Sequence, residues 1–169
     1  LRGRTIGLIG LGKIPQTLVP KAQAFGLNVI ACDPFVEKDI TTALSVKMVD
    51  FEYLLEHSDY ISIHAPLTPD TRHMFNADAF KQMKAGALLI NTARGPLVDE
   101  AALAVALDKG QLAGAALDVL SDEPPSADFV LLNRENVILT PHTAYYSEDA
   151  LLDLQTKAAE DVASDFWTN

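Results

Sequence analysis

Residues 4–33, RTIGLIGLGKIPQTLVPKAQAFGLNVIACD, decide the fold of this 169-residue chain. An apolar run leads directly into Gly10 and Gly12, a helical pattern follows, and a second apolar run ends at Asp33. This order indicates a strand, a tight turn, a helix whose N-terminal amides bind phosphate, and a second strand. A carboxylate at the end of that second strand binds ribose hydroxyls. The stretch therefore predicts a dinucleotide site.

The glycine pattern is incomplete, because Pro15 stands at the position of its third glycine. That glycine allows close packing of the helix on the strand, so the turn and the phosphate contacts do not depend on it. Pro15 falls in the first helical turn, where its missing N–H breaks no intrahelical bond. We expect a slightly displaced helix rather than a lost site. Alone, such a turn also fits other doubly wound proteins and methyltransferases.

Composition and charge indicate one domain that does not bind polyanions. With 49% hydrophobic residues, the chain can bury one sizeable core. A net charge of -10 disfavours nucleic acid as a direct partner, because phosphate neutralisation needs clustered Lys and Arg. No apolar run approaches the roughly 20 residues that span a bilayer. The single Cys32 can form no internal disulfide and indicates a reducing compartment, so we expect a cytoplasmic protein with no membrane partner.

Seven apolar, strand-like runs alternate with helical patterns along the chain. Most of these runs are continuously hydrophobic, as strands covered on both faces must be. The alternation predicts an α/β fold of the Rossmann type, a doubly wound parallel sheet of about seven strands with helices on both faces. The expected strands are 5–9, 28–32, 46–49, 60–64, 87–91, 113–119 and 137–140.

Four helices have recognisable ends or faces. Asn76 and Asp99 are the expected N-caps of helices that stop before glycines, and Ser147 begins the last helix. The helix over 13–25 is expected to bury Ile14, Leu18, Ala22 and Phe25. The last helix has an apolar stripe of Leu151, Leu154, Ala158, Val162 and Phe166.

Three chemically different side chains follow strands of the expected sheet. Arg94, Glu123 and His142 each come after one strand, at the carboxyl edge where ligands of open parallel sheets bind. A guanidinium holds a carboxylate, an imidazole transfers a proton, and a neighbouring carboxylate favours the imidazolium. Taken singly, each residue is more simply a solvated loop side chain. Their common placement predicts reversible reduction of a 2-keto acid, and no residue spacing indicates a metal site or a nucleophile.

Several long motifs resemble, in the right order, the nucleotide-binding domain of the D-isomer-specific 2-hydroxyacid dehydrogenases. The motifs are GLIGLGKIP, CDPF, HAPLTPDTRHMF, NTARGPLVDEAAL, GAALDVLSDEP and LTPH, and the resemblance covers essentially the whole chain. The segment ALSVKMVDFEYLLEHSD and the ending HTAYYSEDA are especially similar to the branch containing the C-terminal-binding proteins, dehydrogenase-like transcriptional corepressors. Tyr145 stands where those corepressors usually have a tryptophan.

The resemblance implies a role for each strand-end residue. His142 is implied as the general acid in reduction and base in oxidation, Glu123 as the partner that raises its proton affinity, and Arg94 as the residue that holds the substrate carboxylate. NAD is the implied cofactor, because Asp33 repels the 2′-phosphate of NADP. The implied cofactor-binding residues are Gly10, Gly12, Lys13, Ile14, Asp33, Ala65, Pro66, Thr71, Thr92, Ala93, Arg94, Asp118, His142 and Ala144.

The resemblance also implies a second domain. Enzymes of this family have a flavodoxin-like substrate domain, which is absent from this chain. We therefore expect residues 1–169 to be the dinucleotide-binding domain of an NAD-dependent 2-hydroxyacid dehydrogenase, inactive when isolated and forming a homodimer. The alternative is an NAD(H)-sensing binding module like the corepressors, because a sensor needs only the nucleotide cleft. The three strand-end residues disfavour a methyltransferase.

Overall fold

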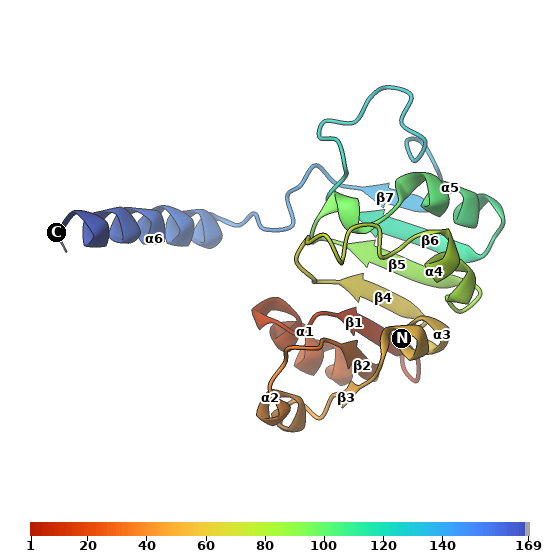
Figure 1. Ribbon diagram of the computed structural model, residues 1–169, viewed down its shortest axis with the longest axis horizontal. Coiled ribbons are helices and arrows are strands. Elements are labelled where there is room, and N and C mark those ends of the chain that lie inside the picture. Colours follow the sequence, from red (N-terminus) through yellow and green to blue (C-terminus); the bar gives the residue numbers. More distant parts are fainter. Residues whose placement is uncertain (168–169) are drawn as a thin grey trace.

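The computed structural model describes the backbone of residues 1–167 and the side chains of residues 1–164. Its centre is a parallel seven-stranded sheet with the order β3-β2-β1-β4-β5-β6-β7 (Figure 1). The strands are β1 Thr5–Ile9, β2 Asn28–Cys32, β3 Lys47–Met48, β4 Tyr60–Ile63, β5 Ala87–Asn91, β6 Leu112–Leu117 and β7 Val137–Leu139. The predicted Rossmann-type class, with its seven parallel strands, is confirmed.

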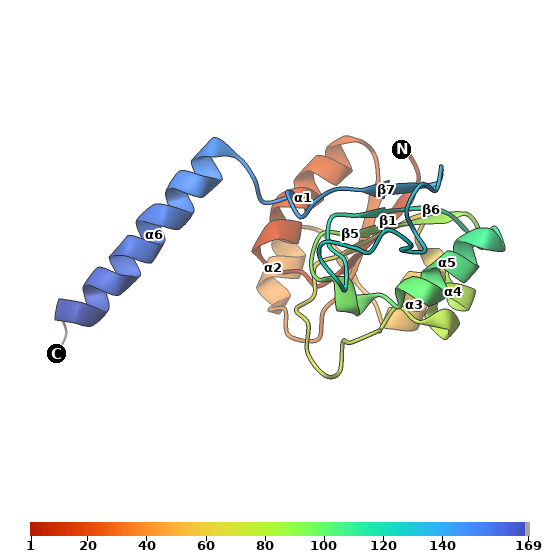
Figure 2. The ribbon, with the colours of Figure 1, turned by 90° about the horizontal axis from the view of Figure 1, so that it is seen from above.

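Helices lie on both faces of the sheet. On one face is α1, with α2 near the β3 edge, and on the other are α3, α4 and α5 (Figure 2). A short 3-10 helix, η1, follows β5. The bounds are α1 Lys13–Ala24, α2 Lys38–Ala43, α3 Phe51–His57, α4 Ala77–Gln82, η1 Gly95–Leu97 and α5 Glu100–Asp108.

The core has two layers because successive side chains of a strand point to opposite faces of the sheet. In β1, Ile6 and Leu8 belong to the cluster that contains Val19 of α1. Ile9 belongs to the other cluster, which contains Leu54 of α3. The sheet is therefore buried on both sides through β1 and β2, and the end of β1 is fixed in position.

The predicted buried face of α1 is right in part. Ala22 is buried and Leu18 is partly buried against the same cluster, as predicted, whereas Ile14 and Phe25 are 73% and 68% exposed. Pro15 and Val19 are buried instead. Both sets are apolar and lie on adjacent helical stripes, so hydrophobicity alone does not distinguish them. Pro15 can be buried in the first turn because it has no N–H that would lose its solvent partner.

The predicted caps are confirmed by hydrogen bonds. Asn76 Oδ1 accepts from the N–H groups of Asp78 and Ala79, at 2.9 and 3.1 Å. Asp99 Oδ1 accepts from the Ala102 N–H at 3.0 Å. These side chains satisfy first-turn amides that have no intrahelical partner, and they fix where α4 and α5 begin.

The last helix, α6 Glu148–Trp167, extends away from the sheet (Figures 1 and 2). Ser147 Oγ accepts from the Ala150 N–H at 3.0 Å, so Ser147 caps this helix as predicted. Of the predicted stripe, Leu151 is half-buried, Leu154, Ala158 and Val162 are exposed, and Phe166 lies outside the described side chains. Through residue 167, no helix is both long and apolar enough to cross a bilayer.

Asp59 links three segments at the amino edge of the sheet. Its Oδ1 contacts Arg4 Nη1 at 3.0 Å and Lys84 Nζ at 2.7 Å, and its Oδ2 accepts from the Thr5 N–H at 2.8 Å. Burial alone would raise the pKa of Asp59, but the hydrogen bonds from Lys84, Thr5 and Arg4 lower it to about 2. The ionised carboxylate therefore stabilises the start of β1 and β4.

We predict that Asp59→Asn lowers the free energy of unfolding at pH 7 by about 1–2 kcal/mol. Because the folded-state pKa of about 2 lies below the ordinary 3.8, this stabilisation is present above pH 3.8 and is lost as the pH falls through about 2. Urea unfolding at pH 7 and at lower pH checks both statements. The control is Asp78→Asn, which removes a fully exposed ion pair with Lys81 and should change nothing measurable. Equal effects of the two substitutions would contradict the assignment.

Candidate active site

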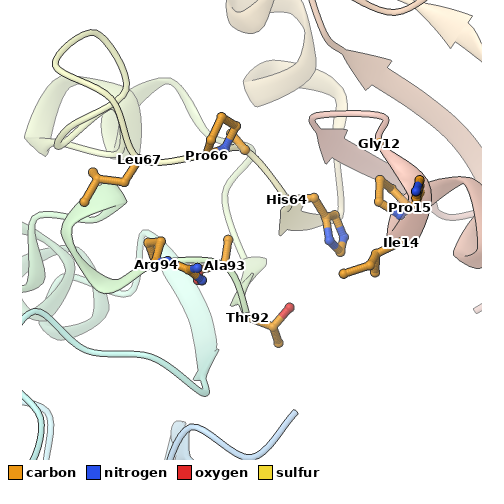
Figure 3. Close-up of a pocket in the computed structure, with 11 residues that line it drawn as sticks. Gly12, Ile14, Pro15, His64, Pro66, Leu67, Thr92, Ala93 and Arg94 are labelled. Carbon is orange, nitrogen blue, oxygen red and sulfur yellow. The ribbon is translucent and has the colours of Figure 1, made fainter. Parts of the chain in front are cut away.

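A cavity of about 730 Å³ opens at the carboxyl edge of the sheet, where β1 and β4 lie side by side. The strand order reverses between these two strands, and ligands of open α/β sheets bind at such a switch point. Segments that follow β1, β4 and β5 line the cavity (Figure 3). They contribute Gly12, Lys13, Ile14 and Pro15, then His64, Ala65, Pro66 and Leu67, and finally Thr92, Ala93 and Arg94.

The glycine turn brings the start of α1 to the cavity wall. Gly10 has a φ of +88°, and a Cβ there would lie 3.0 Å from the His64 carbonyl oxygen, so the close approach of the two loops requires glycine. A Cβ on Gly12 would meet no atom within 4 Å, so the entrance to the helix N-terminus is open. First-turn amides and the positive end of the helix dipole are suited to a phosphate there. The cation of Lys13 adds to this potential.

Asp33 is coupled to the glycine turn directly. Its Oδ2 accepts from the Leu11 N–H at 2.7 Å, and its Oδ1 accepts from the Phe35 N–H at 2.8 Å. Each carboxylate oxygen has a second lone pair that a ribose hydroxyl can use. Asp33 lies outside the first cavity and lines a neighbouring hollow of about 710 Å³ with residues that follow β2 and β3. The carboxylate is thus placed two strands from β4, on the same edge.

His64 forms part of the cavity wall as a neutral imidazole. Its Nε2 lies 2.9 Å from Ser62 Oγ, and its backbone N–H donates to the Ile9 carbonyl at 2.7 Å. Burial lowers the pKa of His64, which disfavours the charged form. The imidazole therefore contributes hydrogen-bonding capacity rather than charge to the cavity.

Arg94 is held by a buried residue that the sequence analysis missed. Asn91, at the end of β5, is fully buried; its Nδ2 donates to the Arg94 carbonyl at 2.9 Å, and its Oδ1 accepts from the Ala93 N–H at 3.0 Å. The exposed Arg94 side chain also donates to the Ala93 carbonyl. The signal for this role is an asparagine that ends the otherwise apolar strand 87–91.

Glu123 and His142 form the pair that their placement predicts. His142 Nδ1 lies 2.7 Å from Glu123 Oε2, while Glu123 Oε1 accepts from the Leu120 N–H at 2.8 Å. The hydrogen bond from His142 lowers the pKa of Glu123, and the Leu120 N–H lowers it further. An ionised Glu123 orients the ring so that Nδ1 carries the proton and Nε2 is left for exchange with a substrate. The ring of Tyr145 meets the imidazole edge-on, with centroids 6.3 Å apart.

Asp118 holds the segment that carries His142. Its carboxylate accepts from the Thr140 hydroxyl and from the N–H groups of Thr143 and Ala144, both at 2.9 Å, and its carbonyl accepts from the His142 N–H. Burial alone would raise the pKa of Asp118, but these hydrogen bonds lower it. Asp118 is 5% exposed, so its carboxylate supports the loop from the interior of the domain. This support holds His142 at a φ of +53°.

The predicted site residues do not all share one space. Glu123, His142 and Asp118 line a hollow of about 370 Å³ beside the first cavity. Ala144 lines a smaller one of about 220 Å³ that it shares with Thr92 and Asp118. Thr71 lines none of these, and its hydroxyl donates to the Pro66 carbonyl at 2.7 Å, which supports the loop that carries Pro66. Among the described residues, no three His, Cys, Asp or Glu side chains group as a metal site.

Gly95 is a second residue that the sequence analysis missed. A Cβ on Gly95 would lie 2.0 Å from the Leu120 carbonyl carbon and 2.4 Å from the Ser121 nitrogen. The backbone that follows Arg94 therefore touches the backbone that precedes Glu123. Only glycine permits this contact, which holds the loop that carries Arg94 against the loop that carries Glu123.

The family model described as D-isomer specific 2-hydroxyacid dehydrogenase, NAD binding domain, matches residues 1–144. A D-3-phosphoglycerate dehydrogenase of Archaeoglobus fulgidus is 44% identical over 164 residues, which are 97% of this chain and 31% of the relative. The chloroplastic D-3-phosphoglycerate dehydrogenase 2 of Arabidopsis thaliana is 42% identical over 96% of this chain and 26% of its own length. The chain thus spans between about a quarter and a third of the length of these curated relatives.

Solved structures show the same similarity. A glyoxylate reductase from Paecilomyes thermophila superposes with a TM-score of 0.91 at 32% identity, over 99% of this chain and 50% of that one. A D-lactate dehydrogenase from Aquifex aeolicus, in complex with NAD and lactic acid, gives a TM-score of 0.88 at 34% identity, over 96% and 53%. Both similarities extend across nearly the whole of the present chain.

We predict that Gly95→Ala separates the Arg94 loop from the Glu123 loop and destabilises the chain by about 1–3 kcal/mol, because the new methyl group overlaps backbone atoms that cannot rotate away. Urea unfolding measures the loss, and NMR shifts of Leu120 and His142 report the displaced loop. The control is Gly12→Ala, whose Cβ meets open space and which should fold with nearly unchanged stability. An unchanged spectrum in Gly95→Ala would show that the two loops are not in contact.

Proposed function

Because the chain belongs to the D-isomer-specific 2-hydroxyacid dehydrogenases and is their NAD-binding domain, we propose that the protein containing it interconverts 2-keto acids and D-2-hydroxy acids by hydride transfer. One observation carries the proposal. Asp33, the α1 N-terminus, Arg94 and the Glu123–His142 pair follow different strands along one edge of the sheet. An extended dinucleotide laid along this edge would connect the ribose-binding acid to the proton-transferring imidazole.

The residues present fit NAD. The open space at Gly12 leaves the first-turn amides of α1 accessible to the pyrophosphate, with the Lys13 ammonium as an additional counter-charge. Asp33 would hold the hydroxyls of the adenosine ribose. Ala65, Pro66, Thr92 and Ala93 would line the nicotinamide side of the cleft. When bound, NADH supplies the hydride.

Substrate binding and proton transfer fall to three side chains. Arg94 would hold the substrate carboxylate bidentately and polarise the keto oxygen. His142 would donate its Nε2 proton to the alkoxide as negative charge develops there, and accept it back in the oxidation direction. Glu123, ionised and bonded to Nδ1, would stabilise the imidazolium that donates this proton in reduction and that forms again in oxidation. A nucleotide sensor requires the cleft but not this pair, so the pair favours an enzyme over a sensing module.

Oligomeric state and location are part of the same proposal. We place the protein in the cytoplasm, and we expect a homodimer formed through this domain, as the family resemblance implies for the oligomeric state. Cys32 is a half-buried free cysteine, and burial raises the pKa of its thiol; a single unpaired cysteine is typical of proteins in a reducing compartment. One relative is named as chloroplastic, so fractionation of cells that express the full-length protein decides the location.

We predict that this chain binds NADH at least about tenfold more tightly than NADPH, because the 2′-phosphate would lie against the ionised Asp33. Fluorescence titration with both nucleotides measures the ratio. Asp33→Asn, which removes the charge and keeps an acceptor for the Leu11 N–H, should narrow the difference. Equal affinities in the unchanged chain would overturn the role given to Asp33.

We predict that His142→Ala lowers kcat for NADH-dependent reduction of 2-keto acids by at least about 100-fold in the full-length protein, because the substitution removes the imidazole that is proposed to donate the proton. Glu123→Gln should cause a smaller loss, since Nδ1 then lacks an ionised partner. NADH affinity of both variants serves as the control and should stay near the original value. Unchanged turnover in His142→Ala would show that His142 is not the proton donor. The NAD(H)-sensing module would then be the better hypothesis.

A further inference from the structure

Glu100, the first residue of α5, is bonded to a loop that lies 21 residues later in the chain. Its Oε1 accepts from the Ser121 N–H at 2.8 Å, and the Ser121 hydroxyl adds a second hydrogen bond. Glu100 is half-buried, and burial raises the pKa of its carboxyl group. The nearby charge of Asp122 also raises this pKa, whereas the hydrogen bonds from Ser121 lower it. A half-buried carboxylate that bonds an amide of another loop restrains that loop more than an exposed one does.

The neighbouring amide of the same loop is bonded to a different carboxylate. The Leu120 N–H donates to Glu123 Oε1, and Glu123 Oε2 bonds to His142 Nδ1. Two consecutive N–H groups, those of Leu120 and Ser121, are therefore held by Glu123 and by Glu100. The orientation of one peptide depends on the other, because the two share a single short stretch of backbone.

The segment that carries Glu100 also carries Arg94. Between them, Gly95 is in backbone contact with Leu120 and Ser121, so the loop is pressed against residues 94–100 at one point and bonded to them at another. The loop over residues 64–75, which follows β4, joins the same segment. The N–H groups of His73 and Phe75 donate to the carbonyls of Pro96 and Leu97, at 2.8 and 3.1 Å.

We propose that Glu100 is a positioning residue for the Glu123–His142 pair: it holds the Ser121 peptide so that Leu120 and Glu123 stay in register with the imidazole. The proposal deepens the proposed function, on which its kinetic consequence rests. The geometric part concerns only this chain. In the full-length protein, loss of Glu100 should reduce kcat and leave the KM for NADH nearly unchanged, because Glu100 lines none of the cavities described above.

Two substitutions separate the reach of the side chain from its charge. Glu100→Asp keeps the charge at the start of α5 but shortens the side chain by one methylene, which withdraws the acceptor from Ser121. Glu100→Gln keeps the length and a carbonyl acceptor but removes the charge. The matched control is Glu52→Ala, which removes an exposed first-turn glutamate from α3, a helix that an aspartate also caps.

Amide hydrogen exchange and imidazole NMR of the labelled 169-residue chain test the proposal without nucleotide or turnover. In Glu100→Asp we expect the Ser121 and Leu120 N–H groups to exchange at least tenfold faster, and the His142 Nδ1 signal to move toward that of Glu123→Gln. Glu100→Gln should stay close to the original chain, and Glu52→Ala should leave all three signals unchanged.

Two results would overturn the proposal. In the first, only the Ser121 N–H is accelerated, and Leu120 and His142 keep their original signals. In the second, Glu52→Ala reproduces the changes, which would make them a general effect of α-helix stability. Neither result bears on turnover by the full-length protein, so a failure here is distinct from a failure of the proposed function.

Discussion

The parallel direction of all seven strands is the constraint on which this site depends. Each strand ends at the same edge, so residues separated by more than a hundred positions in sequence, such as Asp33 and His142, face the same side of the molecule. Five strand spacings of about 4.8 Å separate β2 from β7, which is roughly 24 Å. Only an extended ligand can contact both ends of such a row. The spacing of the strands therefore favours a long ligand with a binding group at each end, whichever side chains line the site.

Carboxylates hold the loops at this edge by accepting backbone N–H groups. Asp33 bonds to the glycine turn, Asp118 to the segment that carries His142, and Glu123 to the turn before it. A carboxylate has several acceptor positions, so each can restrain a loop and still bind a second group. The acidic edge would repel an anionic dinucleotide without compensation. The helix N-terminus and the cations of Lys13 and Arg94 supply positive potential in the cavity between them.

Sequence patterns predict the features that depend on neighbouring residues in the chain. They do not predict the features that depend on packing between distant segments. Strands β1, β2 and β5 begin and end where their apolar runs do, because a strand that is covered on both faces of a parallel sheet is continuously hydrophobic. The predicted face of α1 is right at Leu18 and Ala22 but wrong by one position at its start, because Ile14 and Pro15 are both apolar and only packing against the sheet selects between them. Asn91 and Gly95 act through contacts with distant backbone, which no local pattern reveals. The Glu123–His142 pair was predictable because both residues lie in the loops that leave neighbouring strands, β6 and β7, at the carboxyl edge of the sheet.

The solvent exposure of the Glu123–His142 pair matters for proton transfer but not for nucleotide binding. The side chains of His142 and Glu123 are 45% and 37% exposed, and ion pairs in water are screened and contribute little. Proton transfer to a developing alkoxide gains most when water is excluded and the local dielectric is low. The proposed pyrophosphate site at the N-terminus of α1 needs no such exclusion, because backbone amides bind phosphate at an open helix end. In the proposed function, nucleotide binding therefore needs only residues of this chain, whereas proton transfer would gain from a surface that covers the imidazole.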